Sequence, residues 1–154
     1  MIKIERIQSE GADTFIKKYK PNCLIIVTHP ECTYCKLLKP TLDNVYKDIK
    51  TKYTGNATIY DLHGDAAQVA KSTIPALEFV NGYPTLLISK KNITKPLIYT
   101  GDRTKENIIQ FMIDYLNIKQ NDSKRSKRSK RSKKSKKSKK SKKSKKSKKS
   151  KRVR

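Results

Sequence analysis

No uninterrupted apolar run reaches the roughly 18 residues that a membrane-spanning helix needs, so we predict neither such a helix nor a membrane partner. The first residues also lack the apolar core of a secretory signal peptide. Cysteine is scarce, with Cys23, Cys32 and Cys35 as its only occurrences. Three cysteines without a signal peptide indicate a reducing compartment and argue against a disulfide-based scaffold. We therefore expect the protein in the cytoplasm or nucleus of a host cell, or in a virion if the chain is viral.

Acidic residues are absent from 124–154, although this segment holds 21 of the 38 lysines and arginines. Residues 1–123 are nearly balanced, with 17 basic against 13 acidic side chains and a net charge of +4. Serine recurs at every third position from Ser123 to Ser150. Like charges repel, and the segment has no apolar residue to bury until Val153. The sequence therefore predicts a folded domain at 1–118 and a disordered basic tail at 119–154.

This tail has two functional interpretations. Its lysines and arginines can neutralise phosphates, so residues 123–154 are expected to bind nucleic acid or another polyanion in a strongly salt-dependent way. The same composition is typical of nuclear-localisation signals. A solubilising extension without a partner is the simplest alternative. No aromatic residue interrupts the charges, so base stacking is not expected.

Hydrophobic patterns in residues 1–118 predict an α/β fold. Alternating or β-branched apolar runs predict five strands, at 2–7, 24–27, 57–62, 85–89 and 96–100. Helical spacing predicts four helices, at 12–20, after Cys35, at 66–71 with Asp65 as its cap, and after Gly101. Crossovers followed by a hairpin predict a central mixed sheet of four to five strands with helices on both faces.

The segment Cys32-Thr33-Tyr34-Cys35 stands where the strand at 24–27 passes through a polar turn into a helix. A C-x-x-C pair in that position is typical of a redox dithiol. A thiolate in the first helical turn faces unpaired N–H groups and the positive end of the helix dipole. Its pKa is lowered, so Cys32 is the predicted nucleophile. Cys35, three residues on, can resolve a mixed disulfide.

Two other interpretations of the pair remain open. The pair could be half of a zinc site, but structural zinc takes four ligands and the remaining candidates are Cys23, His29 and His63. Both thiols could instead be buried and inert, although the start of a helix argues against this. Cys23 begins a buried strand and is expected to be a packed, unreactive thiol. His29 and His63 are expected to be solvated turn residues, and no metal is expected.

Residues 1–118 resemble a thioredoxin-fold domain of the thioredoxin and protein disulfide isomerase type. Three segments carry the resemblance in this order: Cys32-x-x-Cys35 with Lys36 and Pro40 after it, Gly82-Tyr83-Pro84-Thr85-Leu86, and Tyr99-Thr100-Gly101 before an amphipathic helix. The resemblance implies a thioredoxin-like fold and a cis bond between Tyr83 and Pro84. It also implies that this loop faces the dithiol and offers backbone hydrogen bonds to a bound peptide.

The sequence departs from that family at several positions. A buried acid normally lies six residues before the first cysteine, where this chain has Ile26. Glu31 replaces the tryptophan beside that cysteine, and should oppose thiolate formation, whereas His29 and Lys36 should favour it. Asp61 is the candidate substitute for the missing proton carrier, provided that its side chain points inward.

These features predict a thioredoxin-like thiol–disulfide oxidoreductase that reduces or rearranges protein disulfides. Cys32 is the expected nucleophile, Cys35 the resolving thiol, and Tyr83 and Pro84 the substrate-binding residues. No cofactor is expected besides the redox-active Cys32–Cys35 disulfide, and the protein is expected to be a monomer. The alternative is a nucleic-acid-binding or packaging protein in which the domain is a non-catalytic scaffold, since a fold does not fix a function.

Overall fold

The computed structural model of the protein describes residues 1–121. The basic tail expected at 119–154 falls almost entirely outside the described residues. Its first residues, Lys119–Gln120, form the short strand β7, which pairs antiparallel with β3 (Tyr53–Thr54). Among residues 1–121, no helix combines the length and apolarity that crossing a membrane requires.

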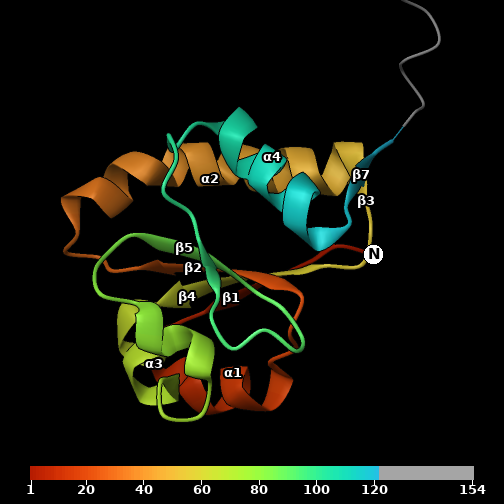
Figure 1. The fold of residues 1–154 in the computed structure, drawn as a ribbon. Helices are drawn as coiled ribbons and strands as arrows, with labels where there is room; N and C mark the ends of the chain where they lie inside the picture. Colours follow the sequence, from red (N-terminus) through yellow and green to blue (C-terminus); the bar gives the residue numbers. More distant parts are fainter. Residues whose placement is uncertain (122–154) are drawn as a thin grey trace, which may run out of the picture. The chain divides into compact units, whose positions relative to one another are not determined.

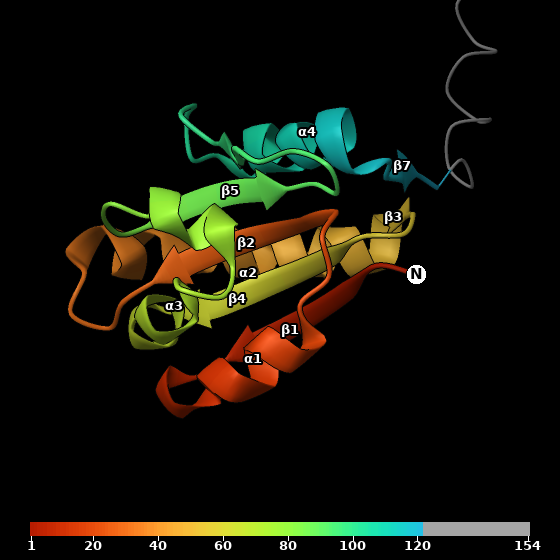
Figure 2. The same cartoon turned by 60° about the horizontal axis from the view of Figure 1, so that its bottom comes forward.

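Five strands form one mixed sheet, as the sequence predicts, and their order is β1-β4-β2-β5-β6. Figure 2 shows β1, β4, β2 and β5 side by side. Their bounds are β1 (Lys3–Ile7), β2 (Cys23–Thr28), β4 (Thr58–His63), β5 (Thr85–Ser89) and β6 (Leu97–Ile98). Strand β4 runs parallel to both β1 and β2, whereas β5 pairs antiparallel with β2 and with β6. The crossovers and the closing hairpin of the prediction are therefore confirmed.

Helices cover both faces of this sheet (Figure 1). Helices α1 (Ala12–Lys18) and α3 (Gly64–Ala70) lie on one face, and α2 (Thr33–Lys52) and α4 (Lys105–Leu116) lie on the other. Short 3-10 turns occupy Ser9–Gly11 and Pro75–Phe79. The result is a three-layer α/β fold in which α2 starts directly beyond the end of β2.

Strand β2 is buried on both sides because both helical layers press on it. Leu24 and Ile26 pack in the core beneath α2 and α4, while Ile25 and Val27 pack in the core beneath α1 and α3. All four side chains have no solvent exposure. A strand covered on both faces reads as a continuous apolar run, which explains the pattern seen in the sequence. Because β2 is held at the centre of the fold, the position of the dithiol a few residues after its end is also fixed.

Two local predictions differ from the structure. Helix α3 starts at Gly64, two residues earlier than expected, and its cap is His63 rather than Asp65: the His63 ring accepts a hydrogen bond of 3.2 Å from the Asp65 N–H. The predicted cap failed because Asp65 already lies inside the first helical turn. The strand expected at 96–100 is only two residues long, because only Leu97 and Ile98 pair with β5 in the antiparallel ladder.

Candidate active site

The dithiol lies at the N-terminus of α2. Cys32 is the N-cap residue, in extended backbone conformation, and its Sγ accepts a hydrogen bond of 3.1 Å from the Cys35 N–H. The Cys32 N–H in turn donates to the His29 carbonyl, at 3.1 Å. A sulfur in this position meets the unpaired amides and the positive end of the α2 dipole, which favour a thiolate over a thiol.

The two sulfurs are joined in a disulfide, with 5.2 Å between the Cα atoms, and they differ in exposure. Cys32 is half-buried, whereas Cys35 is only 6% exposed. The third cysteine, Cys23, is free and fully buried, and burial raises the pKa of its thiol to about 12. The prediction that Cys23 is a packed thiol is therefore confirmed, and its raised pKa agrees with the low reactivity expected of it.

The loop before β5 lies against the chain that leads into the dithiol. The Tyr83–Pro84 peptide bond is cis, as the resemblance implies. The Tyr83 ring stacks on the His29 ring, with 5.5 Å between centroids and 19° between planes. Gly64 makes room for this stack, because a Cβ there would lie 2.8 Å from the Tyr83 ring and 3.1 Å from the His29 ring. The proline loop and the approach to Cys32 are thus packed into one unit.

The two histidines are not the solvated turn residues expected from the sequence. Only 24% of the His29 side chain and 20% of the His63 side chain are exposed, and the ring centroids are 5.3 Å apart. The Asp65 carboxylate lies 3.6 Å from a ring nitrogen of each. The parallel pairing of β2 with β4 places Thr28 beside His63 and so brings the two strand ends, and their histidines, together.

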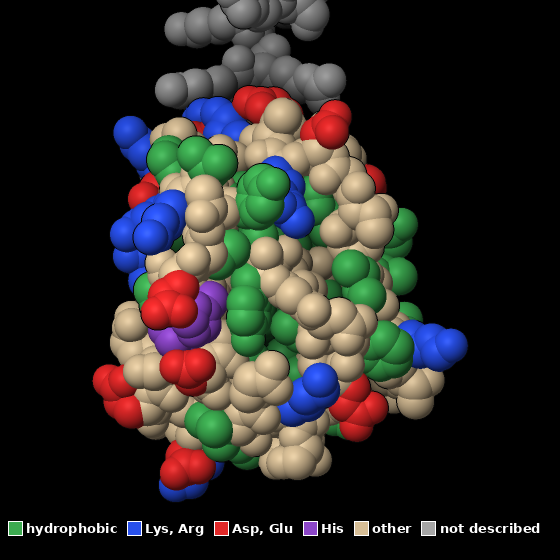
Figure 3. Space-filling model, turned by 90° about the vertical axis from the view of Figure 1, so that its left-hand side faces the viewer, with side chains coloured by type: hydrophobic (Ala, Val, Ile, Leu, Met, Phe, Trp, Pro, Cys, Tyr) green, Lys and Arg blue, Asp and Glu red, His purple; other side chains and the backbone are tan. Residues whose placement is uncertain are grey.

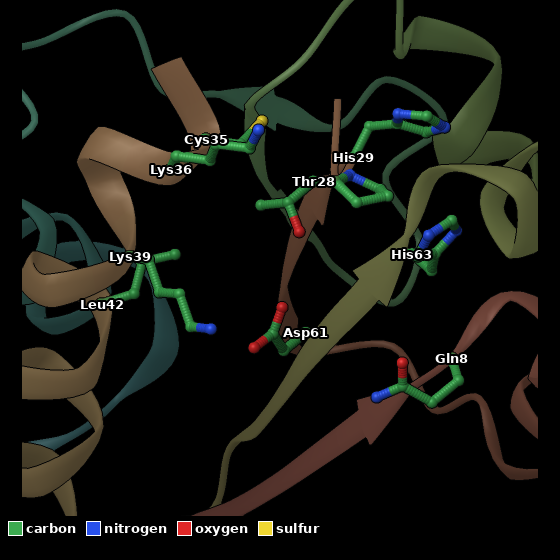
Figure 4. Close-up of a pocket in the computed structure, with 10 residues that line it drawn as sticks. Gln8, Thr28, His29, Cys35, Lys36, Lys39, Leu42, Asp61 and His63 are labelled. Carbon is green, nitrogen blue, oxygen red and sulfur yellow. The ribbon is translucent and has the colours of Figure 1, made fainter. Parts of the chain in front are cut away.

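A cavity of about 410 Å³ opens beneath the dithiol, between the first turns of α2 and the ends of β2 and β4 (Figure 4). Its lining includes Cys35 and Lys36 on α2, Thr28 on β2 and Asp61 on β4. Figure 4 shows the Asp61 carboxylate and the Lys39 ammonium pointing toward each other within this space. A cavity of this size is large enough to hold water, and both Asp61 and Cys35 line it.

Asp61 lies directly beside the position where the resemblance led us to expect an acid. In the parallel ladder, Ile26 of β2 pairs with Asp61 of β4, so the acid is displaced by one strand. Burial raises the pKa of the Asp61 carboxyl, and the nearby Tyr46 hydroxyl and Arg6 guanidinium offset this only in part. The inward-facing orientation that the sequence left open is therefore the observed one.

Sequence reasoning overlooked Arg103, which lies in the loop before α4 and donates a hydrogen bond of 3.3 Å to the Pro84 carbonyl. No motif marks this arginine, because its role depends on two loops meeting in space. Asp61 had a recognisable signal, since it is a polar residue on the same strand face as the buried Ile59. Within residues 1–121, no group of three or more histidine, cysteine, aspartate or glutamate side chains is arranged so that it could hold a metal ion.

Comparisons with known proteins agree with this geometry. The family described as Thioredoxin matches residues 3–114. Protein disulfide isomerase-like 1-1 of Arabidopsis thaliana is 28% identical over 109 residues, which is 71% of this chain and 20% of the relative. A protein disulfide-isomerase of Ricinus communis is 36% identical over 92 residues, 59% of this chain and 17% of the relative. The chain thus spans about a fifth of the length of these curated relatives.

Solved structures support the same fold. The J-Trx1 fragment of ERdj5 superposes with a TM-score of 0.55 at 20% identity, covering 74% of this chain and 52% of that one. The first thioredoxin domain of mouse protein disulfide-isomerase A4 gives a TM-score of 0.52 at 23% identity, covering 71% and 72% of the two chains. With the family match over residues 3–114, the three-layer fold and the cis-proline loop packed beside the C-x-x-C turn, the chain belongs to the thioredoxin family.

Proposed function

We propose that this chain is a thiol–disulfide oxidoreductase that reduces or rearranges disulfides in proteins. Cys32 is the attacking thiol and Cys35 the resolving thiol, and the backbone beside Tyr83 and Pro84 binds the substrate polypeptide. The relatives named protein disulfide-isomerase support this chemistry for the part of their length that the chain matches. The reaction requires no cofactor beyond the Cys32–Cys35 pair.

Each step transfers one sulfur–sulfur bond. The Cys32 thiolate attacks a substrate disulfide, forms a mixed disulfide and releases the first substrate sulfur as a thiolate, which takes up a proton. Cys35 then loses its proton and attacks the Cys32 sulfur, releasing the second substrate thiolate. Two electrons pass from the dithiol to the substrate, and the Cys32–Cys35 disulfide remains. An external thiol restores the dithiol, and the reverse sequence oxidises a substrate.

The difference in exposure between the two cysteines carries the assignment of roles. Cys32 caps the helix and is half-exposed, so a substrate disulfide can reach it. Cys35 is nearly buried and lies within the same turn, so it can reach Cys32 but not a large substrate. An attacking thiol needs access and a low pKa, whereas a resolving thiol needs proximity.

Replacing Cys35 with serine is expected to trap the mixed disulfide. The variant can form the Cys32–substrate disulfide but has no second thiol to resolve it. A covalent adduct with disulfide-bonded insulin should therefore accumulate, appear on a non-reducing gel and disappear after treatment with dithiothreitol. The double variant Cys32→Ser, Cys35→Ser is the matched control and should form no adduct. Equal trapping by the double variant would assign the reactivity to Cys23 and refute the proposed roles.

For the tail, we propose binding to nucleic acid or a similar polyanion, supported by its 21 basic residues without an acid at 124–154. The affinity of the full chain for duplex DNA should fall steeply with salt and be independent of base sequence. Changing four tail lysines to glutamine should lower the slope of log affinity against log salt by about one per lysine that contacts phosphate. A slope unchanged by these substitutions would place the binding elsewhere.

A further inference from the structure

Two large apolar side chains beside the dithiol are open to solvent. Tyr34 is 69% exposed and Leu37 is 70% exposed, although both lie in the first turns of α2, whose neighbouring face is buried in the core. They border a groove of about 170 Å³, here called the α2 groove, whose lining residues are Tyr34, Leu37, Leu38, Thr41 and Arg103. Figure 3 looks onto the end of the molecule where α2 begins and shows hydrophobic side chains gathered on this face.

The α2 groove lies next to the dithiol turn and the proline loop. Tyr34 stands between the two cysteines in sequence, and Leu37 and Thr41 follow at the i+3 and i+7 positions of the same helical stripe. Arg103 closes the opposite wall and is held by its hydrogen bond to the Pro84 carbonyl. A polypeptide laid along Tyr83 and Pro84 therefore has this groove beside it when its disulfide meets Cys32.

The wall of the groove contains one charged residue, which is a cation. Arg103 is that residue, and the other lining side chains are Tyr34, Leu37, Leu38 and Thr41. Within residues 1–121, the carboxylates that form ion pairs do so with other cations, and none pairs with Arg103 or Lys36. A guanidinium with only one of its donors engaged is free to bind a carboxylate.

We propose that the α2 groove selects the substrates of the dithiol: it binds a large apolar side chain close to the reactive cysteine of the substrate, with an acidic residue next to it that pairs with Arg103. This inference rests on the proposed function and adds the class of polypeptide on which it acts. Binding of the substrate side chain buries the apolar surface of Tyr34 and Leu37, and Arg103 makes the groove prefer a substrate with an acidic residue.

The size of the groove favours one side chain of a polypeptide over a small-molecule ligand. A volume of about 170 Å³ is well below the roughly 300–1,000 Å³ of typical small-molecule pockets. A permanently bound partner would also cover the dithiol, which must remain open to successive disulfides. A second copy of this chain would bring its own basic tail, with 21 cations and no acid at 124–154, toward a groove that already contains Arg103, which opposes its binding.

The test compares four synthetic peptides with one intramolecular disulfide and a fluorescent reporter. The two residues after the first cysteine are Leu-Asp, Leu-Lys, Ser-Asp or Ser-Lys, and all else is identical. The full-length protein, kept reduced by dithiothreitol, should reduce the Leu-Asp peptide with the highest kcat/KM. The difference between Asp and Lys should be about twofold to fivefold, the range of an exposed ion pair, and should reside in KM.

Variants connect this preference to the groove. Arg103→Gln should remove the preference for Asp over Lys, and Arg103→Lys should restore part of it, because the charge is kept while the forked geometry is lost. Leu37→Ser should remove the preference for Leu over Ser. The matched controls change one cation and one exposed apolar residue away from the groove. Lys91→Gln lies just after β5, at the end of this strand that pairs with the start of β2, and Val69→Ser changes a residue of α3 that is 59% exposed. Both variants should leave all four rates unchanged.

The outcomes separate this inference from the proposed function. Equal kcat/KM values for the four peptides would overturn the selective groove and leave the oxidoreductase intact. Reduction of none of them, when the same preparation also fails on insulin, would remove the proposed function and the inference with it. A concentration-dependent dimer that Leu37→Ser dissolves, with the peptide preferences unaltered, would identify the groove as an interface between copies and would also overturn the inference.

Discussion

Replacing Cys32 with serine is expected to abolish the catalysed reduction of insulin by dithiothreitol, leaving only the rate of dithiothreitol itself. Cys32 is the accessible sulfur of the pair, and its position as the helix cap stabilises a thiolate. A serine hydroxyl in the same place remains protonated at neutral pH and cannot form a bond with a substrate disulfide. The loss should be roughly 100-fold or more, measured as the rate of insulin B-chain precipitation.

The matched control is Cys23→Ala, which removes the remaining thiol of the chain. Cys23 is fully buried and its thiol pKa is raised to about 12, so it takes no part in exchange at neutral pH. Its replacement should leave the insulin rate unchanged and cost only a little stability. Full activity in Cys32→Ser would instead support a non-catalytic scaffold, in which the basic tail performs the function of the protein.

The sequence was most informative where local chemistry determines structure. The apolar run of β2, the helical spacing after Cys35 and the C-x-x-C turn between them predict the position of the dithiol without any long-range information. Strand β5 was predicted at its observed bounds because Pro84 before it and the apolar residues within it are both local signals. The cis bond at Pro84 came from the resemblance to a family, since a trans proline at a strand start has the same local sequence.

The remaining features depend on contacts between distant segments. Strands β3 and β7 have two residues each and 64 intervening residues between Thr54 and Lys119, so neither has a periodic pattern to detect. His29 and His63 meet only because β2 and β4 end side by side, and each looked like an isolated turn residue in the sequence. Arg103 and Pro84 meet for the same reason. Pairings across a sheet follow from register, which local propensity does not specify.

Replacing Asp61 with asparagine is expected to slow the release of substrate from the mixed disulfide. Asp61 lines the same cavity as Cys35. It also pairs in the β2–β4 ladder with Ile26, which occupies the position where the family has a buried acid. The ionised carboxylate can accept the Cys35 proton through water, and an amide cannot. We expect insulin turnover to fall by roughly tenfold to 100-fold at neutral pH, less than a directly bonded base can provide.

The pH dependence distinguishes proton transfer from a structural effect. Ionised Asp61 is the active form, so wild-type activity should fall as the pH drops through a carboxyl pKa that burial has raised. In Asp61→Asn, activity should instead depend on solvent base and approach the wild-type value as the pH rises. Mixed disulfide trapped by acid quenching during turnover should accumulate in the variant, because the first attack by Cys32 is unaffected.

Asp43→Asn is the matched control, because Asp43 lies 3.3 Å from the same Arg6 guanidinium that approaches Asp61 at 3.8 Å, yet it does not line the cavity. It removes an equal charge and should leave the pH profile of turnover unchanged.

The pH dependence of the free energy of unfolding gives a second test of Asp61, and its direction follows from the raised pKa. A raised pKa in the folded state means that ionising Asp61 opposes folding, so wild-type stability is lost as the pH rises through that pKa. Urea unfolding of Asp61→Asn should therefore show a stability that improves relative to wild type as the pH rises from acidic to neutral values. Parallel activity profiles for Asp61→Asn and Asp43→Asn would show that Asp61 acts only through the charge it places near Arg6, and would exclude it as the proton acceptor for Cys35.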